Sequence, residues 1–325
     1  MRDAAIAALG LERRAGARTD GQLTLGYGPD GMPIGSPVIV LGGAQDGPTL
    51  WIQCCVHGAE VGGIVGLHRF IEALDLGSMR GTIIGVLTAN PLAFLAQQRN
   101  TPFDGENLNR VFPGAEDGPH TRQVAHRLIK AACSVSDAIL DLHSGGDRSH
   151  VPHYSLCWAD GSDAAKRAFA LAGAADVATV WAATDIWLQN SMMAQATRRG
   201  VPMVIVECGG AAQVSDEHAD LFARSIRSIA AAIGILPGRP VRRARAVVDR
   251  CTLVNNTRGG LFEAFIGPGA IVAKDQPIGR VVALDGREVE VIRSPVGPAY
   301  VAAIRKTWSA VTSGEMVAEC NEFTP

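Results

Sequence analysis

Residues 55–60, Cys-Val-His-Gly-Ala-Glu, place an imidazole and a carboxylate three positions apart, at His57 and Glu60. An apolar run that predicts a strand ends here, and a helical pattern begins. One turn of helix brings positions i and i+3 onto the same face, so the two side chains can converge on one cation. The same spacing occurs where a glutamate caps a helix beside an incidental histidine, and these six residues alone leave both interpretations open.

A second histidine, His143, directly follows a short apolar run in residues 141–146, Asp-Leu-His-Ser-Gly-Gly. Ligands of open α/β sheets bind at the carboxyl ends of strands, and Asp141 is placed to orient a metal-bound imidazole. By itself, His143 is equally well a hydrogen-bonded loop residue. Together with His57 and Glu60 it supplies a third ligand and leaves a fourth position for water, which is the pattern of catalytic zinc sites.

A further carboxylate, Glu207, stands at the end of the aliphatic run 202–206. A buried carboxylate is costly unless it has a partner or a catalytic task. Beside a zinc-bound water, Glu207 can accept a proton and later deliver it to a leaving amine. The alternative is a structural carboxylate that is hydrogen-bonded to the amides of the glycines at 209 and 210.

Residues 99–114, Arg-Asn-Thr-Pro-Phe-Asp-Gly-Glu-Asn-Leu-Asn-Arg-Val-Phe-Pro-Gly, form a long polar segment between the two histidine motifs. Its prolines and glycines predict an ordered functional loop. Arg110 can bind a carboxylate through two hydrogen bonds, and Arg99 can polarise a scissile carbonyl and stabilise its oxyanion. Simple solvation at the surface is the alternative for both arginines.

Apolar runs alternate with helical periodicity between residues 38 and 235, which predicts an α/β domain around a largely parallel sheet. We expect strands at 38–41, 49–56, 81–87, 138–142 and 202–206, and helices at about 60–74, 121–132, 164–172 and 216–235. Beyond residue 240, short β-type runs separated by glycines replace the helical pattern. The sequence therefore predicts two domains, residues 1–240 and a small all-β domain of residues 241–325.

The composition narrows the class of protein further. The 325 residues are 47% hydrophobic and carry a formal net charge of −2. This supports a sizeable core and argues against binding to nucleic acid, whose phosphates attract a basic surface. No apolar run reaches the roughly 18 residues of a membrane span, and residues 1–20 do not resemble a signal peptide. Seven scattered cysteines without a Cys-x-x-Cys pair predict free thiols and a cytoplasmic protein without membrane association.

Four motifs, in their order along the chain, resemble those of the succinylglutamate desuccinylase/aspartoacylase family, which has the zinc carboxypeptidase fold. They are His-Gly-x-Glu, Asn-Leu-Asn-Arg-x-Phe-Pro-Gly, Asp-Leu-His and Val-Glu, and the resemblance extends from about residue 37 to 235. It implies a mixed sheet flanked by helices. The form Arg-x-Thr-Pro-Phe-Asp-Gly-x-Asn-Leu-Asn-Arg looks closer to the bacterial branch that includes N-acetyl-diaminobutyrate deacetylase.

The resemblance also implies a role for each motif residue. Arg99 would be catalytic, although the segment between it and Asn109 is longer here than in aspartoacylase. The other implied roles are binding of one zinc ion per chain by His57, Glu60 and His143, general base and acid catalysis by Glu207, and binding of the substrate carboxylate by Asn109 and Arg110.

The C-terminal domain resembles a biotinyl/lipoyl carrier barrel, through Gly-Pro-Gly at 267–269 and Ser-Pro-Val-Gly at 294–297. The lysine that carriers modify is missing from the hairpin near residues 296–298. We therefore expect a structural or pocket-covering domain instead of a swinging arm. Whether Tyr300 on this hairpin, or the pair His150 and His153, contributes to the pocket is left open.

We expect a zinc-dependent amidohydrolase that cleaves the amide bond of a small N-acyl amino acid. A metallocarboxypeptidase acting on peptides uses the same parts and is the first alternative. A non-catalytic binding protein on the same fold is the second, and the presence of all three presumed ligands and the base argues against it. The family often forms homo-oligomers, and the motifs do not fix the acyl group or the amino acid of the substrate.

Overall fold

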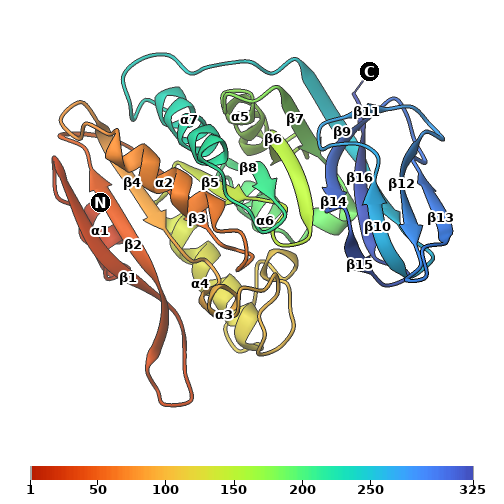
Figure 1. The fold of residues 1–325 in the computed structure, drawn as a ribbon. Coiled ribbons are helices and arrows are strands. Elements are labelled where there is room, and N and C mark those ends of the chain that lie inside the picture. The colour runs from red at the N-terminus through yellow and green to blue at the C-terminus, as the bar shows by residue number, and fades with distance from the viewer. Residues whose placement is uncertain (1, 325) are drawn as a thin grey trace.

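Helices and strands are interspersed up to residue 232, and only strands follow among residues 2–324, which the computed structural model describes (Figure 1). The helices are α1 (Arg2–Ala8), α2 (Gly62–Glu72), α3 (Pro91–Ala96), α4 (His120–Val135), α5 (Asp163–Ala172), α6 (Met192–Arg198) and α7 (Asp216–Ala232), with 3-10 turns η1 (Leu108–Arg110) and η2 (Ile186–Leu188). The strands of the first two-thirds of the chain are β1 (Ala17–Tyr27), β2 (Pro33–Gly42), β3 (Gln45–Cys54), β4 (Arg80–Val86), β5 (Ala138–His143), β6 (Ser149–Trp158), β7 (Thr179–Ala183) and β8 (Met203–Gly210). The later strands are β9 (Ala246–Asn255), β10 (Gly260–Ala264), β11 (Ile271–Val272), β12 (Pro277–Val282), β13 (Glu288–Arg293), β14 (Ala299–Arg305), β15 (Ser309–Val311) and β16 (Met316–Phe323).

One mixed sheet of twelve strands runs through the molecule, in the order β1-β2-β4-β3-β5-β8-β6-β7-β9-β16-β14-β11. The N-terminal hairpin β1–β2, red in Figure 1, therefore lies at the opposite end of the sheet from the blue C-terminal strands. A second sheet of four strands has the order β13-β12-β10-β15. The predicted mixed α/β fold with a C-terminal β-rich region is confirmed.

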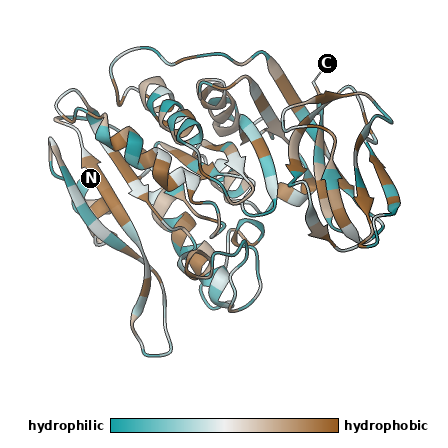
Figure 2. Cartoon of the chain, in the orientation of Figure 1, coloured by the Kyte–Doolittle hydropathy of each residue, from teal (hydrophilic) through white to brown (hydrophobic). Residues whose placement is uncertain are grey.

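Hydrophobic layers cover both faces of the large sheet. Helices α2, α5 and α7 pack on one face, where Phe70 and Phe222 belong to one buried cluster. Helices α1, α4 and α6 pack on the other face, with Leu128 and Met193 in a second cluster. The parallel central strands β3, β5 and β8 are apolar on both sides for this reason, and Figure 2 shows hydrophobic residues along them. Their carboxyl ends meet at one edge of the layered core.

Several elements were not expected from the sequence, namely β1, β6, β7, α1, α3 and α6. Two differences from the expectation have a clear local cause. The helix expected from about Glu60 begins two residues later, because Glu60 lies in a turn whose amide donates to the carbonyl of His57 at 3.1 Å. Strand β6 was not expected, since Pro152 interrupts its apolar pattern. A register shift between Val151 and Tyr154 in the β6–β8 ladder accommodates this proline, which has no amide proton to donate.

The C-terminal strands continue the large sheet. Strand β9 pairs in parallel with β7 and antiparallel with β16, and β14 also contacts β6 through Ile304 and His150. A separate hydrophobic cluster, which includes Phe262, Ile278 and Val317, fills the space around the small sheet. The division into residues 1–240 and 241–325 stays a prediction. All seven cysteines are free, and within residues 2–324 no helix is both long and apolar enough to cross a membrane.

Candidate metal centre and active site

The turn after β3 places His57 and Glu60 at the carboxyl edge of the sheet. Cys55 has a left-handed backbone with φ of 52°, which turns the chain sharply away from the strand. Gly58 passes so close to α3 that a Cβ atom there would lie 1.9 Å from the carbonyl oxygen of Ala93. Glycine is therefore required at this position, and its amide donates to the carbonyl of Gln98 at 2.8 Å. These contacts fix the turn before α2 begins.

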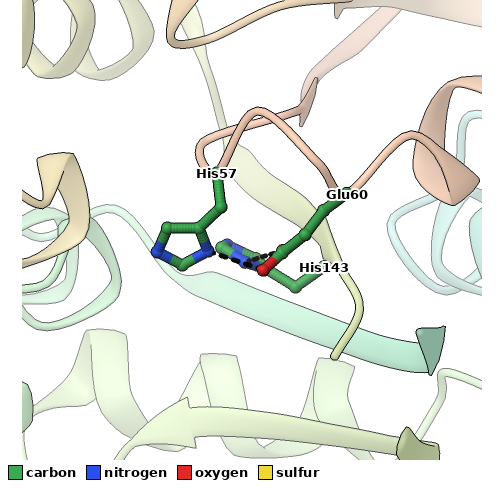
Figure 3. Close-up of side chains that lie close together, drawn as sticks. All are labelled: His57, Glu60 and His143. Atoms are coloured by element: carbon green, nitrogen blue, oxygen red, sulfur yellow. Dashed lines mark hydrogen bonds and ion pairs between the residues drawn. The ribbon is translucent and has the colours of Figure 1, made fainter. Parts of the chain in front are cut away.

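Glu60 lies between the two histidines, and all three side chains are buried. Its Oε1 is 2.8 Å from Nδ1 of His57, and its Oε2 is 2.9 Å from Nδ1 of His143. Figure 3 shows both imidazoles directed at this carboxylate, with His57 and Glu60 on the turn and His143 on β5. One ligand atom from each residue lies within 4.8 Å of the others. Two imidazole nitrogens and a carboxylate oxygen are ligands that zinc accepts, so the group fits a single zinc ion.

The far side of each imidazole is also held. Nε2 of His143 is 3.0 Å from Oδ2 of Asp141, which accepts a hydrogen bond from Nε2 of Gln53 at 3.0 Å. Nε2 of His57 is 3.2 Å from Oδ1 of Asn107. Contacts on the Nε2 side orient metal-bound histidines, and here they leave both Nδ1 atoms directed at Glu60, the third presumed ligand. The sequence predicts this role for Asp141 but not for Asn107, whose only signal is an asparagine ahead of a turn.

The electrostatics of the cluster favour a cation. Burial and the nearby Arg99 lower the pKa of His57 to about 4, so its imidazole is neutral and can bind a metal. Burial favours the neutral form of Glu60, but His57 and His143 outweigh it and hold its pKa well below the usual range. Burial likewise disfavours charge on His143, yet Asp141 and Glu60 raise its pKa well above the ordinary value. A divalent cation bound at Nδ1 would take the place of the proton on the Glu60 side of His143, while Asp141 keeps its contact with Nε2.

Glu207 stands opposite His143 in the β5–β8 ladder, at the end of its strand. Burial, together with the charges of Glu60 and Glu319, raises its pKa to about 8, against an opposing effect of His143. Its Oε2 is buried without a hydrogen-bond partner among the described residues. A carboxylate whose pKa is close to neutral, next to a metal cluster, is suited to accept and donate a proton.

The loop of residues 99–114 brings two arginines to the same place. Nη1 of Arg99 donates to Oε1 of Glu60 at 3.2 Å. The guanidinium of Arg110 lies 4.9 Å from the ring centre of Trp187, and burial together with Arg99 lowers its pKa to about 10, which leaves it charged at neutral pH. Asn109 is buried, and its Oδ1 accepts from the amide of Met192 at 3.0 Å. Substrate contact by Asn109 stays a prediction, and its observed contacts support η1 and α6.

A cavity of about 470 Å³ opens beside these groups. His57, Glu60, Glu207, Arg99 and Arg110 line it, as do Tyr154 and Trp187, which lie outside the four sequence motifs. The C-terminal strands supply the opposite wall, through Leu253, Ala303, Arg305, Glu315, Met316 and Glu319. The cavity therefore depends on residues that are more than two hundred positions apart in the chain.

Comparison with known protein families matches the region that contains the four motifs. The sequence model of the succinylglutamate desuccinylase/aspartoacylase catalytic domain matches residues 46–233. The chain belongs to the succinylglutamate desuccinylase/aspartoacylase family. The family resemblance read from the motifs is thereby confirmed.

Three known proteins match most of the chain. It is 28% identical to the N-alpha-acetyl-L-2,4-diaminobutyric acid deacetylase of Halomonas elongata over 280 residues, which cover 84% of this chain and 82% of that protein. The product-bound structure of the ectoine utilization protein EutE of Ruegeria pomeroyi superposes with a TM-score of 0.83 and 26% identity, covering 94% of this chain and 95% of that one. A succinylglutamate desuccinylase from Silicibacter sp. TM1040, at 22% identity, shares the fold with a TM-score of 0.82, covering 94% of this chain and 95% of that one.

The sequence leaves open whether Tyr300, His150 and His153 contribute to the pocket. None of the three lines the cavity. The ring of Tyr300 packs edge-on against Tyr154, with 6.2 Å between ring centres. Nε2 of His153 lies 2.9 Å from Oγ of Ser225, which itself donates to a backbone carbonyl. His153 therefore donates from Nε2. His150 lies at the start of β6, in the ladder opposite Gly210.

Acid is expected to destabilise the protein through His153. Burial, with a smaller contribution from Arg224, lowers the pKa of its imidazole from 6.5 to about 4. Between these values the unfolded chain binds the proton and the folded chain does not, so this contribution is complete above the unfolded pKa and is lost as the pH falls towards 4. The loss is at most about 3 kcal/mol. Urea unfolding of the parent and of His153→Gln between about pH 4 and 7 should show a weaker pH dependence in the variant.

A His68→Gln variant, changed at an exposed histidine of α2, is the matched control and should follow the parent curve. Parallel stability curves for the parent and His153→Gln would contradict this assignment.

Proposed function

We propose that the chain is a zinc-dependent hydrolase that cleaves the amide bond of a small N-acyl amino acid. The observation that carries the proposal is the placement of Glu207, without a hydrogen-bond partner for its buried Oε2, opposite the His57–Glu60–His143 group in one cavity. The deacetylase of Halomonas elongata, whose name specifies an acetylated diamino acid, supports the type of substrate. One zinc ion per chain is proposed, with no further protein partner required for the reaction.

His57, Glu60 and His143 would hold this zinc ion, which when bound supplies a Lewis acid towards the acyl carbonyl and a water. The residues of the chain then perform the proton transfers. Glu207 accepts a proton from the attacking water and delivers it to the departing amine, which must leave in protonated form. Its pKa near 8 in the absence of a cation suits both directions of transfer.

Arg110 and Arg99 divide the binding of negative charge between them. Arg110 contacts no carboxylate within the described residues, and we assign it the carboxylate of the substrate amino acid. Arg99 shares a Glu60 oxygen with the metal cluster and is placed to stabilise negative charge that develops on the acyl oxygen. Positioning the carboxylate fixes the amide relative to Glu207, which lowers the entropic cost of the reaction.

The size of the cavity favours a small substrate over a peptide. About 470 Å³ is suited to a single acylated amino acid, and strands β9, β14 and β16 contribute to the lining. A carboxypeptidase must leave room for the chain that precedes its scissile bond. The retained ligands and base argue against a non-catalytic binding protein.

A substrate screen tests the proposal. The purified protein, loaded with zinc, is incubated with N-acetyl and N-succinyl amino acids, including acetylated diamino acids, and with short peptides. We expect release of free amine from one or more acyl amino acids and none from the peptides. Hydrolysis of peptides alone would favour the carboxypeptidase, and no hydrolysis with zinc bound would favour the binding protein.

Replacing Asn107 by alanine is expected to weaken zinc binding by about 10- to 100-fold, because His57 loses the acceptor that orients its ring. Oδ1 of Asn107 also accepts from the amide of Asn109 at 2.9 Å, so the variant loosens η1 as well. Competition with a coloured chelator measures the affinity. Asn107→Asp keeps an oxygen at both contacts and should stay close to the parent, whereas parent-like affinity in the alanine variant would exclude the role.

A further inference from the structure

The charged side chains of the cavity differ in whether they have a partner. Three arginines pair with carboxylates of the same cavity: Arg99 with Glu60 at 3.2 Å, Arg148 with Asp147 at 3.8 Å, and Arg305 with Glu315 at 2.7 Å. Three ionisable groups make no ion pair within the described residues: Arg110, Glu207 and Glu319. The proposed function gives Arg110 and Glu207 their tasks and leaves Glu319 without one.

Glu319 occupies a defined place on the C-terminal wall. On β16 it stands opposite Ala303 of β14 and Leu253 of β9, and all three residues line the cavity. Residues opposite one another in antiparallel strands project from the same face of the sheet, so the carboxylate stands between two apolar neighbours. Burial raises the pKa of Glu319, against the opposing charges of Arg99 and Arg110. A carboxylate in such surroundings is costly unless a cation reaches it.

Binding of the substrate changes the charge around Glu319. Arg110 is one of the cations that stabilise the Glu319 carboxylate in the free protein. When the carboxylate of the substrate occupies Arg110, that stabilisation is offset by a new negative charge. Arg99 is already shared with Glu60. A positively charged group on the substrate, placed close to Glu319, would restore that stabilisation.

We propose that Glu319 binds a protonated amine on the side chain of the substrate, and that it selects N-acylated diamino acids over acyl amino acids with uncharged side chains. This inference rests on the proposed function and adds to it the residue that determines specificity. An acylated diamino acid carries a carboxylate for Arg110, an amide for the cluster and Glu207, and an ammonium group for Glu319. Its three functional groups match the three ionisable side chains of the cavity that make no ion pair.

The test compares two substrates that differ in one group. Nα-acetyl-2,4-diaminobutyrate carries an ammonium group where Nα-acetyl-norvaline carries a methyl group of similar size. With zinc-loaded parent protein, we expect kcat/KM to favour the diamino acid by at least about tenfold. In Glu319→Gln, we expect kcat/KM for the diamino acid to fall by about 10- to 100-fold, mainly through KM, since the amide keeps the shape but loses the charge. Activity on the norvaline derivative should stay within about threefold of the parent.

Glu315→Gln is the matched control, because it removes a carboxylate of the same cavity that already has a partner in Arg305. It should leave the ratio between the two substrates unchanged. Equal hydrolysis of both substrates by the parent would overturn the inference and leave the deacylase function intact. Equal losses on both substrates in Glu319→Gln, at an unchanged melting temperature, would also overturn it, because they would indicate a structural role near Arg110.

Failure of the proposed function gives a different result. If the parent hydrolyses neither compound, calorimetry with 2,4-diaminobutyrate and norvaline still tests Glu319. Tighter binding of the diamino acid, weakened in Glu319→Gln, would support the inference, and equal or absent binding would overturn it.

Discussion

Glu207→Gln is expected to lower kcat by about 10²- to 10⁴-fold on any acyl amino acid that the parent hydrolyses. The amide has the shape of the carboxylate but cannot accept a proton from water at neutral pH. Glu207 belongs to β8 and does not contribute to the His57–Glu60–His143 group, so zinc content should stay at the parent value. Stopped or continuous assays of amine release, with metal analysis of the same samples, measure both quantities.

Glu263→Gln provides the matched control for this loss. Glu263 pairs with Arg280 on the small sheet and does not line the cavity, so its replacement should leave kcat within about twofold of the parent. A Glu207→Gln protein with full activity on every substrate of the parent would show that proton transfer takes place elsewhere, and the mechanism proposed above would be wrong.

Removal of the metal is expected to abolish hydrolysis. Lewis-acid stabilisation is worth several kcal/mol, which corresponds to a loss of at least about 10³-fold. A strong chelator followed by desalting should give an inactive protein that regains activity with one equivalent of zinc. In Glu60→Ala the same treatment should fail, because the carboxylate that lies 2.8 and 2.9 Å from the two Nδ1 atoms is gone.

Circular dichroism of the chelated protein distinguishes loss of chemistry from loss of fold. We expect its helix and strand content to match the parent, since the cluster lies at the edge of a sheet whose core is filled by large apolar side chains. Full activity after exhaustive chelation, or zinc rescue of Glu60→Ala, would contradict the assignment of this group as the metal site.

The sequence predicts those parts of the site that local pattern determines. His143 and Glu207 directly follow apolar runs, and parallel strands bring the residues after such runs to one edge. Local pattern does not specify whether the helix begins before or at the glycines 62 and 63. In the structure α2 begins at Gly62, after Glu60. The sequence pattern did not predict strand β6, because pairing with β8 outweighs the low strand propensity of Pro152.

The residues missed by the sequence depend on distant pairing. Asn107 meets His57 across fifty positions, and nothing in its neighbourhood specifies that contact. Glu319 reaches the cavity only because β16 inserts between β9 and β14 in a particular register, with bulges on both sides. The spacing of side chains along one segment carries no information about the register between strands. A shift of one residue would place every side chain of the strand on the other face of the sheet. The motifs therefore could not predict which C-terminal residues line the cavity.

The arrangement of the cavity has a consequence for how this family can diversify. The groups that we propose for bond cleavage lie between residues 57 and 207, whereas the wall that we propose to face the substrate side chain is formed by lining residues between positions 253 and 319. Substitutions on β9, β14 and β16 can alter the wall without touching the cluster. Descendants of one ancestral hydrolase could thus acquire new substrates by exchanging a few side chains on three neighbouring strands, while the reaction itself is inherited unchanged.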